Sequence, residues 1–183
     1  MSSTYDPLML PLAAFARSGA ALQGTFPLAD LVRLRAQSLA EPVDTAAHFD
    51  AKGSERFDAT GHPQVWLHLS GSCRLTLECQ RCLRPAEVDL SFVRDFRFVA
   101  NEALAAVEDE ESEEDVLVFE RQFNLRDLVE DELLMAIPLV PMHPSCPETP
   151  RLSVADPDFD AAAQEQTHPF AALAGLKRTS SSD

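Results

Sequence analysis

Cys79 and Cys82, two thiols separated by two residues, interrupt the most regular strand pattern in the chain. Residues 73–79 alternate between apolar and polar side chains, which is the period of a half-buried β-strand. Pro85 breaks the chain after the second cysteine, and a new alternation then places apolar residues between 88 and 98 on one face. The sequence therefore predicts a long β-hairpin whose tight turn carries both thiols.

Three interpretations of this turn are compatible with the residues. A redox pair needs a helix N-terminus that lowers the thiol pKa, whereas the residues after Cys82 lead through Pro85 into a strand. A structural zinc ion needs two further ligands, and His143 and Cys146 supply one nitrogen and one sulfur. The third interpretation is a reduced turn that binds nothing. Spacing alone leaves the choice open between an empty turn and zinc held by four ligands: Cys79, Cys82, His143 and Cys146.

The charge of the chain limits its partners. Thirty acidic residues against fifteen basic ones give the 183 residues a formal net charge of −15, which repels bare nucleic acid over most of the surface. No apolar run is long enough to span a bilayer, and the first residues lack the basic and apolar regions of a signal peptide. Four cysteines, two of them in one turn, fit a reducing compartment. We therefore expect a soluble, cytoplasmic protein without membrane contact.

Arginine dominates the basic residues, with only two lysines, Lys52 and Lys177. Five arginines lie on or beside the predicted hairpin and are the candidate RNA- or partner-binding residues: Arg74, Arg81, Arg84, Arg94 and Arg97. One interpretation is a single phosphate-binding face, because the guanidinium fork suits phosphate. The commoner arrangement is pairing with nearby acids, here Glu78, Glu87, Asp89 and Asp95.

The rest of the chain shows shorter regular segments. We expect helices over residues 11–17 and 27–35, and strands over residues 21–26, 43–49, 65–69 and 116–119, with a polar loop at 51–63. Gly71 and Ser72 mark a bulge or a short break before the hairpin. His68 shares the polar face of its strand with Trp66, so we expect this histidine to be exposed or hydrogen-bonded, not a metal ligand.

Residues 102–115 form the most acidic segment, with eight acidic residues and no basic one. A segment with this charge cannot bury itself, so we expect a solvated, mobile acidic loop. Its simplest role is solubility, and its functional role would be to engage a basic partner.

The best helix pattern covers residues 125–137. Asn124 is a plausible N-cap, and the apolar residues of the helix recur on one side, while Glu130 and Asp131 are expected to face water. Pro138 ends the helix, and a proline-rich extended segment then leads to His143 and Cys146.

These segments predict one α+β domain over residues 1–146, in which an antiparallel sheet around the hairpin packs against the 125–137 helix. From residue 147 to 183, Pro, Asp, Ala and Gln dominate, which predicts a mostly flexible tail. Within that tail, residues 169–178 have the pattern of a short amphipathic helix.

Three segments, residues 75–82, 127–141 and 169–177, resemble in order the signature blocks of the YceD family, the large ribosomal RNA subunit accumulation proteins of bacteria, with relatives in chloroplasts. The resemblance implies a role in synthesis, processing or stability of 23S ribosomal RNA, and it supplies no catalytic residues. Some members carry a second Cys-x-x-Cys-like set where this chain has His143 and Cys146. This chain departs from that pattern by having histidine in place of one thiol.

We therefore expect a non-catalytic factor that supports 23S ribosomal RNA accumulation. Its partners would be a basic ribosomal or ribosome-assembly protein and, directly or indirectly, 23S ribosomal RNA, without a small-molecule substrate. The sequence has no paired carboxylates with a histidine on one element, no Gly-rich phosphate loop and no Ser/His/Asp set. The alternatives are a thiol oxidoreductase or metal-dependent hydrolase that uses Cys79 and Cys82, and a zinc-binding interaction module unrelated to ribosomes.

Overall fold

The structure is a computed structural model of the chain, which divides into two compact units, residues 1–146 and 147–183. The residues that it describes are 5–39, 45–110, 112, 114–148 and 154. The helix expected over residues 169–178 therefore lies outside the described residues. Everything below concerns the first unit and the two residues that follow it.

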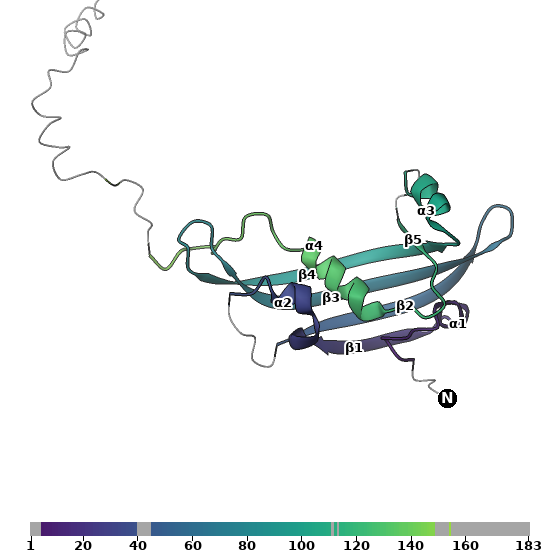
Figure 1. Ribbon diagram of the computed structural model, residues 1–183, viewed down its shortest axis with the longest axis horizontal. Helices are drawn as coiled ribbons and strands as arrows, with labels where there is room; N and C mark the ends of the chain where they lie inside the picture. Colours follow the sequence, from purple (N-terminus) through teal and green to yellow (C-terminus); the bar gives the residue numbers. More distant parts are fainter. Residues whose placement is uncertain (1–4, 40–44, 111, 113, 149–153, 155–183) are drawn as a thin grey trace, which may run out of the picture. The chain divides into compact units, whose positions relative to one another are not determined.

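Five strands form one sheet in the order of the sequence, β1-β2-β3-β4-β5 (Figure 1). Their bounds are Ala21–Pro27, Ala46–Phe57, Pro63–Glu78, Pro85–Val99 and Asp115–Val118. The first four strands pair antiparallel with their neighbours, whereas β5 pairs parallel with β4. The expected α+β class is confirmed. The expectation of a purely antiparallel sheet is wrong, because the edge strand β5 is parallel to β4. The chain enters β5 after a helical crossover, which is the connection that parallel neighbours need.

The predicted hairpin is formed by β3 and β4, with Cys73 opposite Leu90 and Leu77 opposite Ala86. The expected break near Gly71 is wrong, because β3 runs through it without interruption. A Cβ atom on Gly71 would lie 2.5 Å from the ring of Phe92, so glycine lets the strand pass beneath that ring.

Strand β2 is longer than expected, since the residues predicted as a polar loop from 51 onward continue the strand to Phe57. The small residues Ala51 and Gly53 hold the buried positions here, while Lys52 and Arg56 lie on the opposite side. Small side chains gave the segment no apolar alternation, and this is why its strand character was missed.

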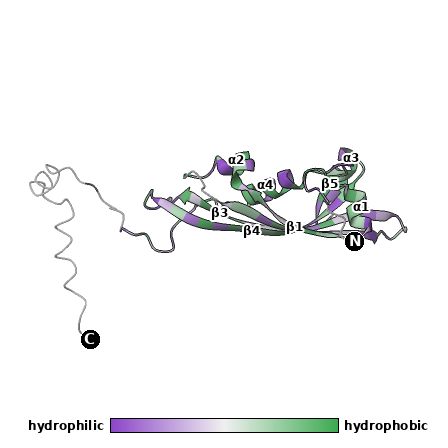
Figure 2. Ribbon diagram, turned by 90° about the horizontal axis from the view of Figure 1, so that it is seen from below, coloured by the Kyte–Doolittle hydropathy of each residue, from purple (hydrophilic) through white to green (hydrophobic). Residues whose placement is uncertain are grey.

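The helices are α1 (Leu12–Arg17), the 3-10 helix η1 (Leu28–Asp30), α2 (Val32–Arg35), α3 (Glu102–Asp109) and α4 (Leu125–Met135). Helix α1 was predicted, but the helix expected over 27–35 is split at Leu31, whose φ of −96° and ψ of 77° are not helical. None of the helices in the described part of the chain is long and apolar enough to cross a membrane. Figure 2 shows α1, α2, α3 and α4 on one side of the sheet.

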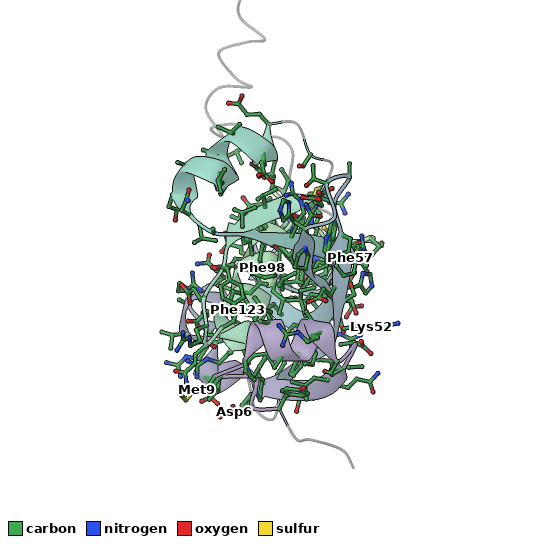
Figure 3. All side chains as sticks on the ribbon, turned by 90° about the vertical axis from the view of Figure 1, so that its right-hand side faces the viewer. Asp6, Met9, Lys52, Phe57, Phe98 and Phe123 are labelled. Atoms are coloured by element: carbon green, nitrogen blue, oxygen red, sulfur yellow. The ribbon has the colours of Figure 1, made fainter. Side chains whose placement is uncertain are left out.

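The core lies between the sheet and these helices. Its largest fully buried side chains are those of Phe15, Phe96, Leu10, Leu12, Leu28, Leu31, Leu34, Leu67, Leu69, Leu75, Leu125 and Leu133. Phe98 and Phe123 add an edge-to-face pair with ring centroids 5.3 Å apart (Figure 3). The N-terminal segment is tied to the same region, because Leu10 and Phe123 exchange two backbone hydrogen bonds of 2.9 Å.

Helix α4 begins as predicted, with the Asn124 side chain accepting from the backbone N–H of Arg126 at 3.2 Å. The expectation that Glu130 faces water is wrong, because this residue is only 6% exposed. One of its carboxylate oxygens accepts from the backbone N–H groups of Arg33 at 2.7 Å and Leu34 at 3.1 Å. Glu130 therefore caps the short helix α2 from a distance of almost a hundred residues in the chain.

The acidic segment is also more ordered than expected, because residues 102–109 form α3 and residues 115–118 form β5. The side chain of Asn101 caps α3 by accepting from the backbone N–H of Leu104 at 3.0 Å. Beneath this segment lies the guanidinium of Arg97, which donates to the carboxylates of Glu108 and Glu114. The prediction of a mobile loop over 102–115 is wrong for these elements, because one buried arginine compensates part of the charge.

Candidate metal centre

The turn between β3 and β4 is tight and holds its two thiols on one side. The backbone N–H of Cys79 donates to the carbonyl of Arg84 at 2.9 Å, and that of Leu83 donates to the carbonyl of Cys79 at 2.8 Å. Leu83 has a φ of 56°, in the left-handed region that non-glycine residues seldom adopt. No helix follows Cys82, so the turn lacks the helix N-terminus that a redox pair uses.

The second pair of ligands is carried by the extended segment after α4. The backbone N–H of Gln80 donates to the carbonyl of Pro141 at 2.8 Å, which holds this segment against the turn. The backbone N–H of His143 points at the sulfur of Cys79 at 3.4 Å. Two regions more than fifty residues apart in the sequence thus meet at the hairpin tip.

The four predicted ligand atoms lie within 4.8 Å of one another: those of Cys79, Cys82, His143 and Cys146. The sulfurs of Cys79 and Cys146 are 3.9 Å apart, and the sulfur of Cys82 is 3.4 Å from Nδ1 of His143. Tetrahedral zinc, with bonds of about 2.3 Å to sulfur and about 2.0–2.1 Å to nitrogen, places two sulfurs about 3.8 Å apart and sulfur and nitrogen about 3.5 Å apart. The donor set fits such an ion in both composition and spacing.

The imidazole of His143 is oriented for ligation through Nδ1. Its other nitrogen, Nε2, lies 2.9 Å from the carbonyl oxygen of Pro85. A carbonyl can only accept, so this contact places the proton on Nε2 and leaves the lone pair of Nδ1 directed at the sulfurs. Metal-bound histidines in proteins are commonly fixed by an outer hydrogen bond of this kind.

The surroundings of Cys79 favour the thiolate. Burial by itself raises the pKa of its thiol. Backbone N–H groups directed at the sulfur act in the opposite sense and lower the pKa to about 5, namely those of His143, Cys82 and Arg81. A thiolate is the form that binds a metal ion.

Arg81 supplies positive charge beside the sulfurs. Its Nε donates to the sulfur of Cys146 at 3.0 Å, and a terminal nitrogen donates to the carbonyl of His143 at 2.8 Å. The hydrogen bond to Cys146 raises the pKa of the Arg81 guanidinium. Three thiolates and one divalent ion sum to a single negative charge, which this guanidinium offsets. The sequence had suggested Arg81 as an RNA contact, although its position between the two turn cysteines was a signal for this role.

The remaining cysteine, Cys73, is not part of the cluster. It is 5% exposed within β3, as expected for a buried strand residue, and burial raises the pKa of its thiol. All four cysteines of the chain are free thiols.

The five candidate arginines do not share one surface. Arg74 is on the open side of the sheet, where it donates to Asp89 at 2.6 Å. Arg94 lies on the helix side, 3.6 Å from the carboxylate of Glu132. Arg97 is only 6% exposed, whereas Arg81 and Arg84 lie in the turn. The five arginines therefore lie on both sides of the sheet and in the turn, and their role as RNA or partner contacts stays a prediction.

Comparisons with known proteins agree with the pattern of the hairpin and of α4. A family model described as "Large ribosomal RNA subunit accumulation protein YceD" matches residues 67–177, a range that includes all four candidate ligands. A curated Haemophilus influenzae protein of that name is 34% identical over 123 residues, which cover 63% of this chain and 68% of the relative. No solved structure matches the chain.

Proposed function

This chain belongs to the YceD family, and we propose from that membership that it supports the accumulation of 23S ribosomal RNA without catalysing a reaction. The match over residues 67–177 carries the proposal, because it includes the hairpin and α4 together. We include in it a structural zinc ion at the hairpin tip and a basic protein of the large ribosomal subunit or its assembly as the main partner.

The ligand geometry supports a structural role for the metal. Three sulfurs and one nitrogen complete a tetrahedron, so no position is left for a water molecule or substrate. Cys79, the thiol whose pKa is lowered, is fully buried at 0% exposure, whereas a thiolate that attacks a substrate disulfide must be reached by it. Cys82 is only half-buried, and burial raises the pKa of its thiol. These observations favour a binding protein over a hydrolase or an oxidoreductase.

Purified protein is expected to contain about one equivalent of zinc, because the four ligands form one closed site. Replacing Cys82 by Ser should abolish this zinc content in elemental analysis. The melting temperature should fall by only a few degrees, since the metal fixes the hairpin tip and the hydrophobic core lies elsewhere. Cys73→Ser is the matched control and should retain the metal. Zinc-free protein with an unchanged melting temperature in strong chelator would contradict the proposal.

The acidic segment supports a basic protein as partner. Glu108 and Glu114 are occupied by Arg97, whereas Glu102 and Glu110 are exposed. Exposed carboxylates on a chain of net charge −15 attract and steer a basic surface. RNA would have to overcome the same field, so we rank it as the weaker contact.

The test uses a strain that lacks the gene, with the ratio of 23S to 16S ribosomal RNA as the first readout and affinity capture as the second. The wild-type chain should restore the ratio. The double variant Glu102→Gln/Glu110→Gln should restore it only in part and recover severalfold less basic ribosomal protein at low salt. The control Asp30→Asn/Glu78→Gln changes the net charge equally at exposed positions outside α3 and should behave as wild type.

A ratio that does not respond to loss of the chain would refute the proposed function. Equal capture by both double variants and by the wild type would refute the acidic segment as the partner surface, and it would leave the role in RNA accumulation standing.

A further inference from the structure

We propose that the open side of the sheet, around Lys52, Arg56, Trp66 and His68, binds single-stranded RNA. This inference rests on the proposed function and assigns the direct RNA contact to a surface different from the hairpin arginines. It is called the open-face site below, and it consists of these four residues with Ser54.

The strands place these side chains together. Alternation on β2 directs Lys52, Ser54 and Arg56 away from the buried Ala51 and Gly53. On β3, His68 is opposite Lys52, and Trp66 is opposite Ser54. Helices α1, α2 and α4 lie on the other side of the sheet (Figure 2), and Lys52 extends from the molecule into solvent (Figure 3). The open side is bordered near Trp66 by Arg97, its partner on β4, which Glu108 of α3 and Glu114 bind.

The surface at this site is hollowed. A depression of about 420 Å³ is lined by Lys52, Ser54, Arg56, His68 and Asp95. A second depression of about 640 Å³ lies farther along the same strands, and its lining includes the hydroxyl groups of Thr25, Ser70, Ser72 and Ser91, together with larger side chains such as His48 and Asp50. Hydroxyl groups along such a path are suitable donors and acceptors for the phosphates and 2′-hydroxyls of RNA.

The two cations of the open-face site keep their charge available. Within the described residues, no carboxylate lies within ion-pair distance of Lys52 or Arg56, in contrast to Arg74, Arg94 and Arg97. Arg56 instead places its guanidinium carbon 4.0 Å from the ring centroid of Trp66. Two uncompensated cations beside one aromatic ring are the elements of single-strand recognition, in which phosphates are neutralised while bases stack.

The nearest acids are partly compensated by their own neighbours. Asp95 lies 3.0 Å from Nδ1 of His68, and Asp50 accepts a hydrogen bond from the side chain of Gln23. A depression that borders the site is lined by Arg56 and Trp66 together with Asp95, Glu114 and Asp115; Glu114 pairs with Arg97, and Asp115 lies 3.9 Å from Arg94. Within the described residues, Lys52 and Arg56 are the cations of this site that have no carboxylate partner. A protein partner is the less suitable occupant, because interface cores prefer several apolar side chains and the depression of the open-face site offers two cations, a carboxylate, a serine and a histidine.

Trp66 gives a direct measurement, because it is the only tryptophan in the chain. A single-stranded RNA oligonucleotide of mixed sequence, about 12 nucleotides long to cover one site, is titrated into the purified protein at low salt. Stacking of a base should change the fluorescence of Trp66 in a saturable manner. The double variant Lys52→Gln/Arg56→Gln should bind at least tenfold more weakly. Its slope of log affinity against log salt should decrease by about 1.4, which is about 0.7 for each lost phosphate contact.

Arg74→Gln is the matched control on the same side of the sheet, and it should change RNA affinity by less than twofold because Asp89 already pairs with Arg74. Unchanged melting temperatures exclude misfolding as a cause.

Equal affinity of wild type and double variant, or RNA binding without a change in Trp66 fluorescence, would overturn the site. Absence of RNA binding by the wild type would do so too. If the wild type bound no RNA and the double variant also failed to restore the cellular ratio of 23S to 16S ribosomal RNA, the surface would contact protein. In each case a wild-type chain that restores this ratio keeps the proposed function intact.

Discussion

Replacing Glu130 by Ala is expected to lower the free energy of unfolding by about 2–3 kcal/mol, which corresponds to a fall in melting temperature of roughly 5–10 °C. The carboxylate is buried and accepts from the backbone N–H groups of Arg33 and Leu34, and it also binds the Arg33 side chain at 2.9 Å. Alanine would leave both N–H groups of α2 without an acceptor, and α2 would lose its main link to α4. Chemical denaturation and a thermal scan measure the change.

Asp131→Ala provides the matched control for Glu130. Asp131 also pairs with Arg33, but both side chains are about half exposed, and its loss should cost less than about 0.5 kcal/mol. The Glu130→Gln variant should be intermediate, because an amide oxygen can still accept from both N–H groups, whereas the second carboxylate oxygen, which binds the Arg33 side chain, is lost. If the Glu130 and Asp131 variants melted at the same temperature, the carboxylate would not cap α2 in solution.

Arg97→Ala is the second variant with a large expected effect, about 2–4 kcal/mol, centred on α3 and β5. Arg97 donates to Glu108, to Glu114 at 2.7 Å and to the hydroxyl of Ser112 at 2.8 Å. Its removal would leave two neighbouring carboxylates without a counter-charge in an already acidic segment. Hydrogen exchange should show the backbone amides of residues 102–118 exchanging faster, while those of β3 stay protected.

Two further variants separate charge from packing at Arg97. Adding Glu108→Gln and Glu114→Gln to Arg97→Ala should recover part of the lost stability, because the repulsion between the carboxylates disappears. Arg74→Ala, which removes an exposed pair with Asp89 on the same side of the sheet, should be nearly neutral. Equal effects of Arg74→Ala and Arg97→Ala would show that burial of the guanidinium contributes nothing.

The hairpin and the clustering of its thiols were predictable because the relevant signals are local. Alternation from Cys73 to Cys79 determines which side chains face the core, and the two-residue spacing determines which thiols share a turn. The pairing with His143 and Cys146 followed from ligand chemistry, since zinc needs four donors and the chain offers one matching second pair.

The role of Glu130 was not predictable, because its partners lie 96 and 97 residues away and nothing near Glu130 indicates them. Helix α3 was missed for a different reason. Its charge was weighed more heavily than its Ala and Leu content and its Asn101 cap, which are local helix signals. The sequence also gave no indication that Arg97 would be buried. Arg97 shares the polar face of the predicted strand with Asp95, and residues on that face are expected to be exposed.

The open-face site was also not predictable from the sequence, because it depends on the pairing of two strands. Lys52 and Arg56 were not predicted as binding residues, because they lie in a segment predicted as a polar loop. Only the pairing of β2 with β3 brings them beside Trp66, and only the ion pairs elsewhere show which cations remain uncompensated.

The link between Leu10 and Phe123 has a consequence for synthesis of the chain. Strands β2, β3 and β4 each pair with the strand made just before, so β1 to β4 can assemble as they leave the ribosome. The part of the helix side that α4 covers must wait, because Leu10 can bond to Phe123 only after residue 123 has emerged, and α4 follows at Leu125–Met135. During this interval the nascent chain presents an uncovered apolar face, which is the surface that chaperones bind and through which incomplete chains aggregate.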